Sequence, residues 1–208
     1  MSATGPDLAS GDEISLLPVT GGRLMRGTVV EIMAAVDGAA VRVELLPRAG
    51  SWMHGVRTWV IRGPGDRGTM AVYEGRLRVQ GTSRWPELVE LNLLADESRR
   101  AALRAAARHP MLLVRPGKVS RATESLDLSS TGCRVTVPDG QELAAGQVVQ
   151  VAVDLDAGSS VWAEAQVVWS DGDTRTAALR FTRVDPADQE RLDRGVLAAL
   201  ATRSPRGS

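Results

Sequence analysis

Apolar and polar residues alternate in short runs along most of this 208-residue chain, and this pattern restricts the fold more than any other feature. Val41, Val43 and Leu45 alternate with charged residues, and valines recur at the same period of two in residues 148–154. A period of two places successive side chains on opposite faces of a β-strand. The chain should therefore consist mainly of strands that have one buried face and one wet face.

Turn-forming pairs separate these runs and favour antiparallel hairpins. Asp37-Gly38 is one such pair in the first half of the chain, and Asp139-Gly140 is one in the second. About five or six short strands with no convincing helix over residues 13–94 indicate a small barrel or sandwich. Six further strand-like runs within residues 110–201 predict a second small antiparallel barrel.

A helix is expected to follow the last of these strands. Asp185 can cap its start, and Pro186 suits the first helical position. Leu192, Val196 and Leu200 repeat every four residues and give the helix one apolar face. We expect this face to pack against the second barrel or to plug it.

The segment between the two barrels has a different composition. Residues 95–109 are made almost wholly of strong helix formers, and Pro110 ends the pattern. Isolated helices shorter than about 12 to 15 residues are marginal in water. We therefore expect a linker that becomes fully ordered when something binds its arginines.

These patterns divide the chain into five parts. The predicted parts are a disordered N-terminus (residues 1–12), a β-barrel domain (13–94), an arginine-rich linker (95–109), a second β-barrel with a C-terminal helix (110–201) and a disordered tail (202–208).

Charge and composition exclude several classes of function. Lys+Arg and Asp+Glu both total 25, so the formal net charge is zero and a general DNA- or RNA-coating role is disfavoured. No apolar run is long enough to span a bilayer, and the first residues lack the pattern of a signal peptide. We expect a soluble cytoplasmic protein without membrane insertion.

Catalytic and metal chemistry have little support in the sequence. Cys133 is the single cysteine, which excludes an internal disulfide and a cysteine zinc cluster, and it is expected to be a small buried side chain. His54 and His109 are the only histidines and lie far apart in sequence, so we expect no metal site. No spacing suggests a Ser/His/Asp set, so the protein is not expected to be an enzyme.

The aromatic content is mostly tryptophan, and core anchoring is the default expectation for such large side chains. The tryptophans are Trp52, Trp59, Trp85, Trp162 and Trp169.

Two polar patterns flank the first strand of the predicted second barrel. Arg104 and Arg108 are four residues apart, so on a helix they would point the same way and could hold one planar, anionic ligand. Asp127, Ser129 and Gly132 form a tight polar turn between two strand-like runs.

These patterns resemble the paired RxxxR and DxSxxG motifs of the PilZ family, bacterial receptors for the second messenger cyclic di-GMP. The resemblance covers residues 99–200 and includes the six strands, the VVW and LRF endings of the last two and the capped helix. Ala177 and Ala178 stand where a family member often has glycine. The upstream barrel resembles the split-barrel-like N-terminal domain of flagellar-brake-type proteins.

The resemblance implies a binding role for each motif residue. Arg104 and Arg108 would bond bidentately to guanine or phosphate and could stack on the purine. Asp127 would accept hydrogen bonds from guanine N1 and N2, and Ser129 would offer its hydroxyl to a base or phosphate. Gly132 would permit a close backbone approach. Cyclic di-GMP would then be a ligand, and no cofactor is implied.

The register of the arginine motif has an alternative. Arg100 and Arg104 also form RxxxR. We prefer Arg104 with Arg108, because in the family the second arginine is followed almost at once by the first strand, and here His109-Pro110 begins it. Arg100 then becomes an auxiliary phosphate contact.

The resemblance implies a receptor that changes its interdomain arrangement on binding cyclic di-GMP and signals to an unidentified protein partner. The alternative is a degenerate PilZ protein that acts as a ligand-independent protein-interaction module. The sequence leaves open whether the chain forms a homodimer and how many ligands it binds.

Overall fold

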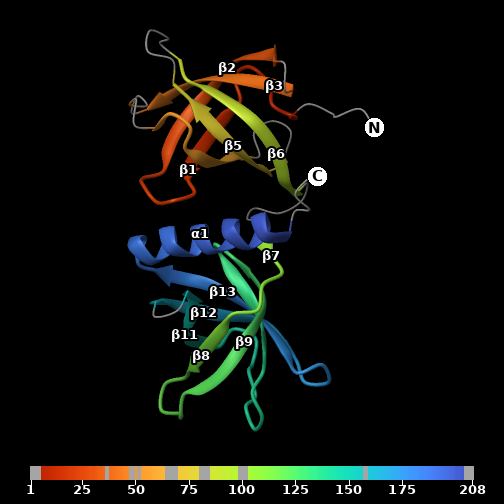
Figure 1. The fold of residues 1–208 in the computed structure, drawn as a ribbon. Helices are drawn as coiled ribbons and strands as arrows, with labels where there is room; N and C mark the ends of the chain where they lie inside the picture. The colour runs from red at the N-terminus through yellow and green to blue at the C-terminus, as the bar shows by residue number, and fades with distance from the viewer. Residues whose placement is uncertain are drawn as a thin grey trace. The chain divides into compact units, whose positions relative to one another are not determined.

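The computed structural model describes residues 6–35, 38–46, 50, 53–63, 70–79, 85–97, 103–156 and 159–203. The chain divides into two compact units, residues 1–101 and 102–208. Each unit contains a closed barrel of antiparallel strands, and one helix ends the second unit (Figure 1). The predicted fold class, a mainly β protein with two small barrels and a C-terminal helix, is confirmed.

Six strands form the barrel of the first unit in the order β1-β2-β3-β6-β5-β4, and β1 closes it by pairing with β4. The strands are β1 (Glu13–Pro18), β2 (Met25–Ala35), β3 (Gly38–Leu46), β4 (Arg57–Arg62), β5 (Met70–Arg78) and β6 (Glu87–Glu97). The alternating residues of β3, which are Val41, Val43 and Leu45, are at most 3% exposed and face the core. The period of two in the sequence therefore marks the buried face.

The described part of the segment before β1, residues 6–12, packs on this barrel, which differs from the disorder predicted there. Leu8 is 6% exposed and belongs to the core of the first barrel. Asp7 pairs with the buried guanidinium of Arg62 at 3.6 Å. Backbone hydrogen bonds add to these contacts, because the N–H of Gly11 donates to the carbonyl of Val29 at 2.8 Å and the N–H of Val29 donates to the carbonyl of Asp12 at 2.9 Å. Residues 1–5 lie outside the described residues.

The second barrel consists of six strands and carries one short additional strand. They are β7 (Arg104–Ala105), β8 (Pro110–Val114), β9 (Arg121–Ser129), β10 (Gly132–Thr136), β11 (Val148–Asp156), β12 (Ser159–Asp171) and β13 (Thr176–Val184). The order around the barrel is β10-β13-β12-β11-β8-β9, and the β9–β10 pairing closes it. β7 is the additional strand and pairs with β9 beyond the end of β8.

The interior of the second barrel follows the same alternation. Val149, Val151 and Val153 are fully buried. Cys133 is 2% exposed, as predicted for a small buried side chain. Burial raises the pKa of its thiol, so at neutral pH it is a protonated packing group and not a nucleophile.

Helix α1 (Pro186–Arg203) lies against the second barrel, where it contacts β7, β9, β11 and β12 (Figure 1). The predicted cap is confirmed, because a carboxylate oxygen of Asp185 accepts the Ala187 N–H at 2.9 Å. Leu192 and Val196 are buried as predicted, and Leu200 is half-buried. Among the described residues, no helix combines the length and the apolar character needed to cross a membrane.

The tryptophans do not all serve as core anchors. Trp59 is 4% exposed and fits that prediction, whereas Trp162 is 49% and Trp169 is 42% exposed. The latter two lie at positions of β12 whose side chains face away from the barrel, so the prediction is wrong for them. Trp85 is half-buried, and Trp52 lies outside the described residues.

Candidate ligand-binding site

The described parts of the arginine-rich segment, residues 95–97 and 103–109, contain strand and no helix, although the segment is rich in helix formers. β6 extends to Glu97, and Arg104 lies in β7, where it pairs with Ser129 of β9. Leu103 and Ala105 are 7% and 0% exposed on either side of Arg104. Strand pairing and burial of these two side chains outweigh the weak intrinsic preference for helix. Residues 98–102, and with them Arg100, lie outside the described residues.

The structure brings Arg104 and Asp127 together, and it adds a second arginine. Arg104 Nη1 lies 3.3 Å from Asp127 Oδ1, and Arg134 Nε lies 3.2 Å from Asp127 Oδ2. The backbone N–H of Arg134 also donates to Asp127 Oδ1 at 3.2 Å. The Asp127 side chain is 9% exposed, whereas those of Arg104 and Arg134 are 38% and 47% exposed. A nearly buried carboxylate thus lies under two solvent-facing cations, as burial of a charge requires.

Arg134 is absent from the residues that the motifs single out, although the sequence contains a signal for it. Ser129 and Gly132 are paired on either side of a two-residue turn, so Asp127 lies opposite Arg134 in the β9–β10 hairpin. Counting outward from the turn in the sequence gives the same pair. Opposite charges directly across an antiparallel pair attract each other.

The Ser129 hydroxyl stabilises the hairpin itself. It donates to the carbonyl of Gly132 at 2.9 Å and lies 3.4 Å from the backbone nitrogen of Thr131. Ser129 is 2% exposed. From the other side, the side-chain amide of Gln189 in α1 donates to the carbonyl of Ser130 at 3.0 Å. The turn of the motif is therefore held by its own serine and by the helix.

Gly132 permits a close approach of two strands. A Cβ atom at this position would lie directly against the carbonyl oxygen of Leu179 and 3.2 Å from the Cα of Arg180, both in β13. These are backbone atoms within a paired ladder, so they cannot move aside easily. The glycine of the motif is thus required by the close pairing of β10 with β13.

Asp127, Arg104 and Arg134 form what we call the Asp127 cluster. Arg108 does not belong to it. Its guanidinium forms an ion pair with Glu124 of β9. The side chains of Arg108 and Glu124 are 68% and 43% exposed, so the pair is a surface pair. The two arginines of the predicted motif therefore hold different acidic partners in this structure.

Beside the Asp127 cluster, the outer face of the barrel is formed by β13 and then by β12. Arg134 lies opposite Ala178, and Ala178 lies opposite Trp169 on its other side. Gly132 lies opposite Arg180, whose guanidinium donates to Gln166 at 2.8 Å. One small residue, Ala178, therefore separates Arg134 from the half-exposed indole of Trp169.

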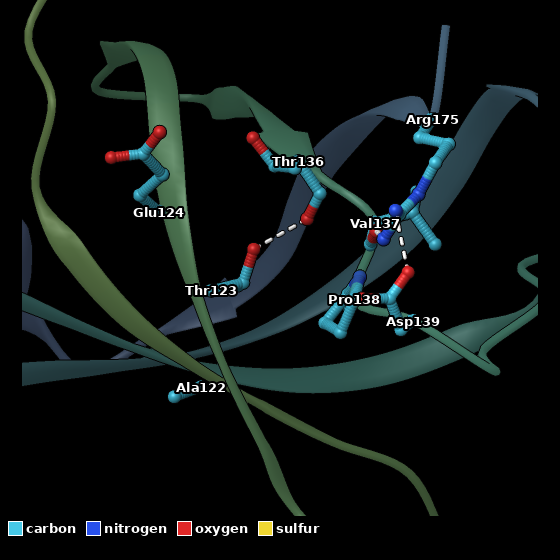
Figure 2. Close-up of a pocket in the computed structure, with 8 residues that line it drawn as sticks. All are labelled: Ala122, Thr123, Glu124, Thr136, Val137, Pro138, Asp139 and Arg175. Carbon is cyan, nitrogen blue, oxygen red and sulfur yellow. Dashed lines mark hydrogen bonds and ion pairs between the residues drawn. The ribbon is translucent and has the colours of Figure 1, made fainter.

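A separate pocket of about 450 Å³ opens beyond the last β9–β10 pair (Figure 2). Thr123 donates a hydrogen bond to the carbonyl of Thr136 on one side, and Arg175 pairs with Asp139 at 2.5 Å on the other. None of the motif residues lines this pocket, but Glu124, the partner of Arg108, does.

Among the described residues, no group of three or more His, Cys, Asp or Glu side chains could hold a metal ion.

Comparison with family models decides the identity of the second unit. Residues 98–198 match the model of the PilZ domain. This part of the chain is a PilZ domain. The resemblance inferred from the motifs is thereby confirmed. No curated protein matches the chain in sequence.

Several solved structures are similar to the chain at low sequence identity. The inhibitor of motility MotI/DgrA from Bacillus subtilis is 14% identical with a TM-score of 0.45, and the match covers 95% of this chain and 100% of that one. YcgR from Escherichia coli in complex with c-di-GMP is 15% identical with a TM-score of 0.43, covering 92% and 85%. MrkH from K. pneumonia in complex with c-di-GMP is 14% identical with a TM-score of 0.37, covering 94% and 90%.

The position of Gly132 generates a first prediction. Gly132→Ala should lower the free energy of unfolding by about 1 to 3 kcal/mol, because the added methyl group overpacks a paired ladder. Urea unfolding of the full chain measures this change. Gly172→Ala is the matched control, since a Cβ at Gly172 meets nothing within 4 Å and should leave the midpoint nearly unchanged. Equal midpoints for the two variants would contradict the steric role of Gly132.

Proposed function

We propose that the PilZ domain is a receptor for cyclic di-GMP, which binds on the outer face of the β9–β10 hairpin. The observation that carries this proposal is the nearly buried Asp127 carboxylate between Arg104 and Arg134. The ligand carries two phosphates and two guanines, so its site must offer cations together with an acceptor for guanine N–H groups. An acidic group beneath two exposed guanidinium groups supplies both.

Each residue of the cluster has a suitable chemical role. The Asp127 carboxylate would accept from guanine N1 and N2, and Arg104 would bond to guanine O6 and N7 or to a phosphate. Ser129 is turned into the hairpin and would act mainly by holding the turn in shape. Arg100 keeps its proposed role as an auxiliary phosphate contact.

The neighbouring face suits a stacked base. Trp169 and Arg134 flank Ala178 on adjacent strands, so about 9.5 Å separates their backbones at two strand spacings. The small side chain between them leaves room for a flat ring beside the half-exposed indole. Aromatic side chains stack favourably on nucleobases of any sequence. We include Trp169 in the proposed site for this reason.

Arg108 would change partners when the ligand binds. Its ion pair with Glu124 is solvent-exposed, and exposed pairs contribute only about 0.2 to 1 kcal/mol. A doubly charged ligand offers a stronger bidentate partner than one carboxylate. The ligand would thus draw Arg108 from Glu124, and its binding would favour one arrangement of the linker over another.

The proposal extends to signalling. The change in the linker would alter the arrangement of the two barrels and be sensed by a downstream protein partner in the cytoplasm, without catalysis and without a cofactor.

The competing function is a ligand-independent interaction module, which is favoured by the fact that Asp127 is already satisfied by arginines of the same chain. Calorimetric silence of the wild type towards cyclic di-GMP would favour that alternative.

Removing a charged contact tests the site. Arg104→Ala, Arg108→Ala or Asp127→Ala should each weaken cyclic di-GMP binding by roughly ten- to a hundred-fold, because one charged set of hydrogen bonds contributes about 1.5 to 3 kcal/mol. Isothermal titration calorimetry of the full chain gives the affinities, and guanosine monophosphate serves as the ligand control. Arg183→Ala is the matched variant, since this exposed arginine lies on β13 outside the proposed site. Undiminished affinity in Arg108→Ala and Asp127→Ala would rule out the assignment.

The Arg108–Glu124 pair makes a second prediction for the same titration. Glu124→Gln should tighten binding by up to about fivefold, since the ligand no longer competes with a carboxylate for Arg108. The gain should shrink as salt concentration rises. In an Arg108→Ala background the Glu124→Gln change should have no effect. A gain that persists in that background would show that Glu124 acts through another group.

A further inference from the structure

Arg134 holds the Asp127 carboxylate at two points. Its Nε contacts Oδ2 at 3.2 Å, and its own backbone N–H donates to Oδ1 at 3.2 Å. Two donors from one residue engage both oxygens of the carboxylate. The terminal torsion of aspartate has a broad energy profile, so such a two-point contact fixes an orientation that the side chain does not hold by itself.

The two arginines of the Asp127 cluster lie in strands that differ in length and in the number of neighbouring strands. Arg134 lies within β10, which is paired with β9 on one side and with β13 on the other. Arg104 lies in β7, which is only two residues long and pairs with β9 alone. Arg134 is therefore the partner whose position the barrel fixes. Arg104 is the partner better placed to turn from Asp127 to a ligand.

The orientation of Asp127 matters for the identity of the base. Guanine presents two donors side by side, at N1 and N2, and a correctly turned carboxylate accepts both. Adenine presents an acceptor at N1 beside its amino donor, so the same carboxylate would face a lone pair. A carboxylate that can rotate would lose most of this discrimination. Whatever orients Asp127 therefore determines the selectivity between the two purines.

We propose that Arg134 is a positioning residue that determines base specificity, by orienting Asp127 so that the site selects guanine over adenine. This inference rests on the proposed cyclic di-GMP function. It assigns to Arg134 a role separate from that of a cation, because cyclic di-GMP and cyclic di-AMP carry the same two phosphates. A cation that serves only the phosphates would support both ligands equally.

The test compares the two ligands on the full chain. Affinities of cyclic di-GMP and cyclic di-AMP are measured by displacement of a fluorescent cyclic di-GMP from the wild type, Arg134→Ala and Arg134→Lys. Both variants should lower the ratio of the two affinities by at least about fivefold, which is the low end for one bidentate base contact. Lysine retains the charge but lacks the donor at the Nε position, so Arg134→Lys should lose selectivity while keeping more of the overall affinity than Arg134→Ala.

The outcomes separate this inference from the function on which it rests. Absence of cyclic di-GMP binding to the wild type would overturn the proposed function and the inference with it. An equal loss of affinity for both ligands in the variants, or an unchanged ratio, would overturn the inference alone. Each replacement keeps the backbone N–H donor, and the Arg134 side chain is 47% exposed, so both variants should fold. Thermal unfolding of each variant checks this point.

Discussion

The Asp127 carboxylate depends on two arginines, and the proposed site is arranged around this contact. A carboxylate that is 9% exposed needs charged partners or several hydrogen bonds, because its desolvation is otherwise costly. Arg134 supplies a side-chain contact and a backbone donor, and Arg104 supplies a third contact. The same two cations face solvent, so the interactions that stabilise the buried charge also present positive charge to a ligand.

The hairpin that carries this carboxylate also closes the second barrel. β9 pairs with β10 and β8, and its end also pairs with β7. Gly132 allows β10 to approach β13, while Ser129 and Gln189 hold the turn. Residues that resemble a ligand motif are therefore also structural parts of the barrel. A loss of binding in a variant of Gly132 would need a stability measurement before it could be attributed to a lost ligand contact.

The chain combines a fixed half and a less constrained half of the proposed site. Asp127 lies in the nine-residue strand β9, and Arg134 lies in β10, which is paired on both sides. Arg104 belongs to a two-residue strand, and Arg108 follows it with an exposed ion pair. A ligand that contacts both halves would change the surroundings of the segment between the barrels. In the proposed receptor, this arrangement would connect ligand occupancy to the linker, because the exchange of the exposed Arg108–Glu124 contact costs little.

Much of the fold could be predicted from local patterns. The period of two marked the buried faces of β3 and β11, turn residues separated the strands, and Asp185 with Pro186 marked the start of α1. The motif spacing also indicated a PilZ domain and singled out Asp127, which lies beside Arg104 and Arg134 in the structure. These features depend on neighbouring residues in the sequence, so the chemistry of each short segment is enough to reveal them.

By itself, then, the sequence determined the strand-rich fold, the capped helix and the family of the second unit. Only the tertiary structure decided that Arg104 lies in a strand, that Arg108 pairs with Glu124 and that Leu8 is buried. It also decided that Arg134 shares the Asp127 carboxylate and that Trp162 and Trp169 face outward. The physical reason is that helix propensity and composition are weak local terms, whereas burial and strand pairing join residues far apart in the chain.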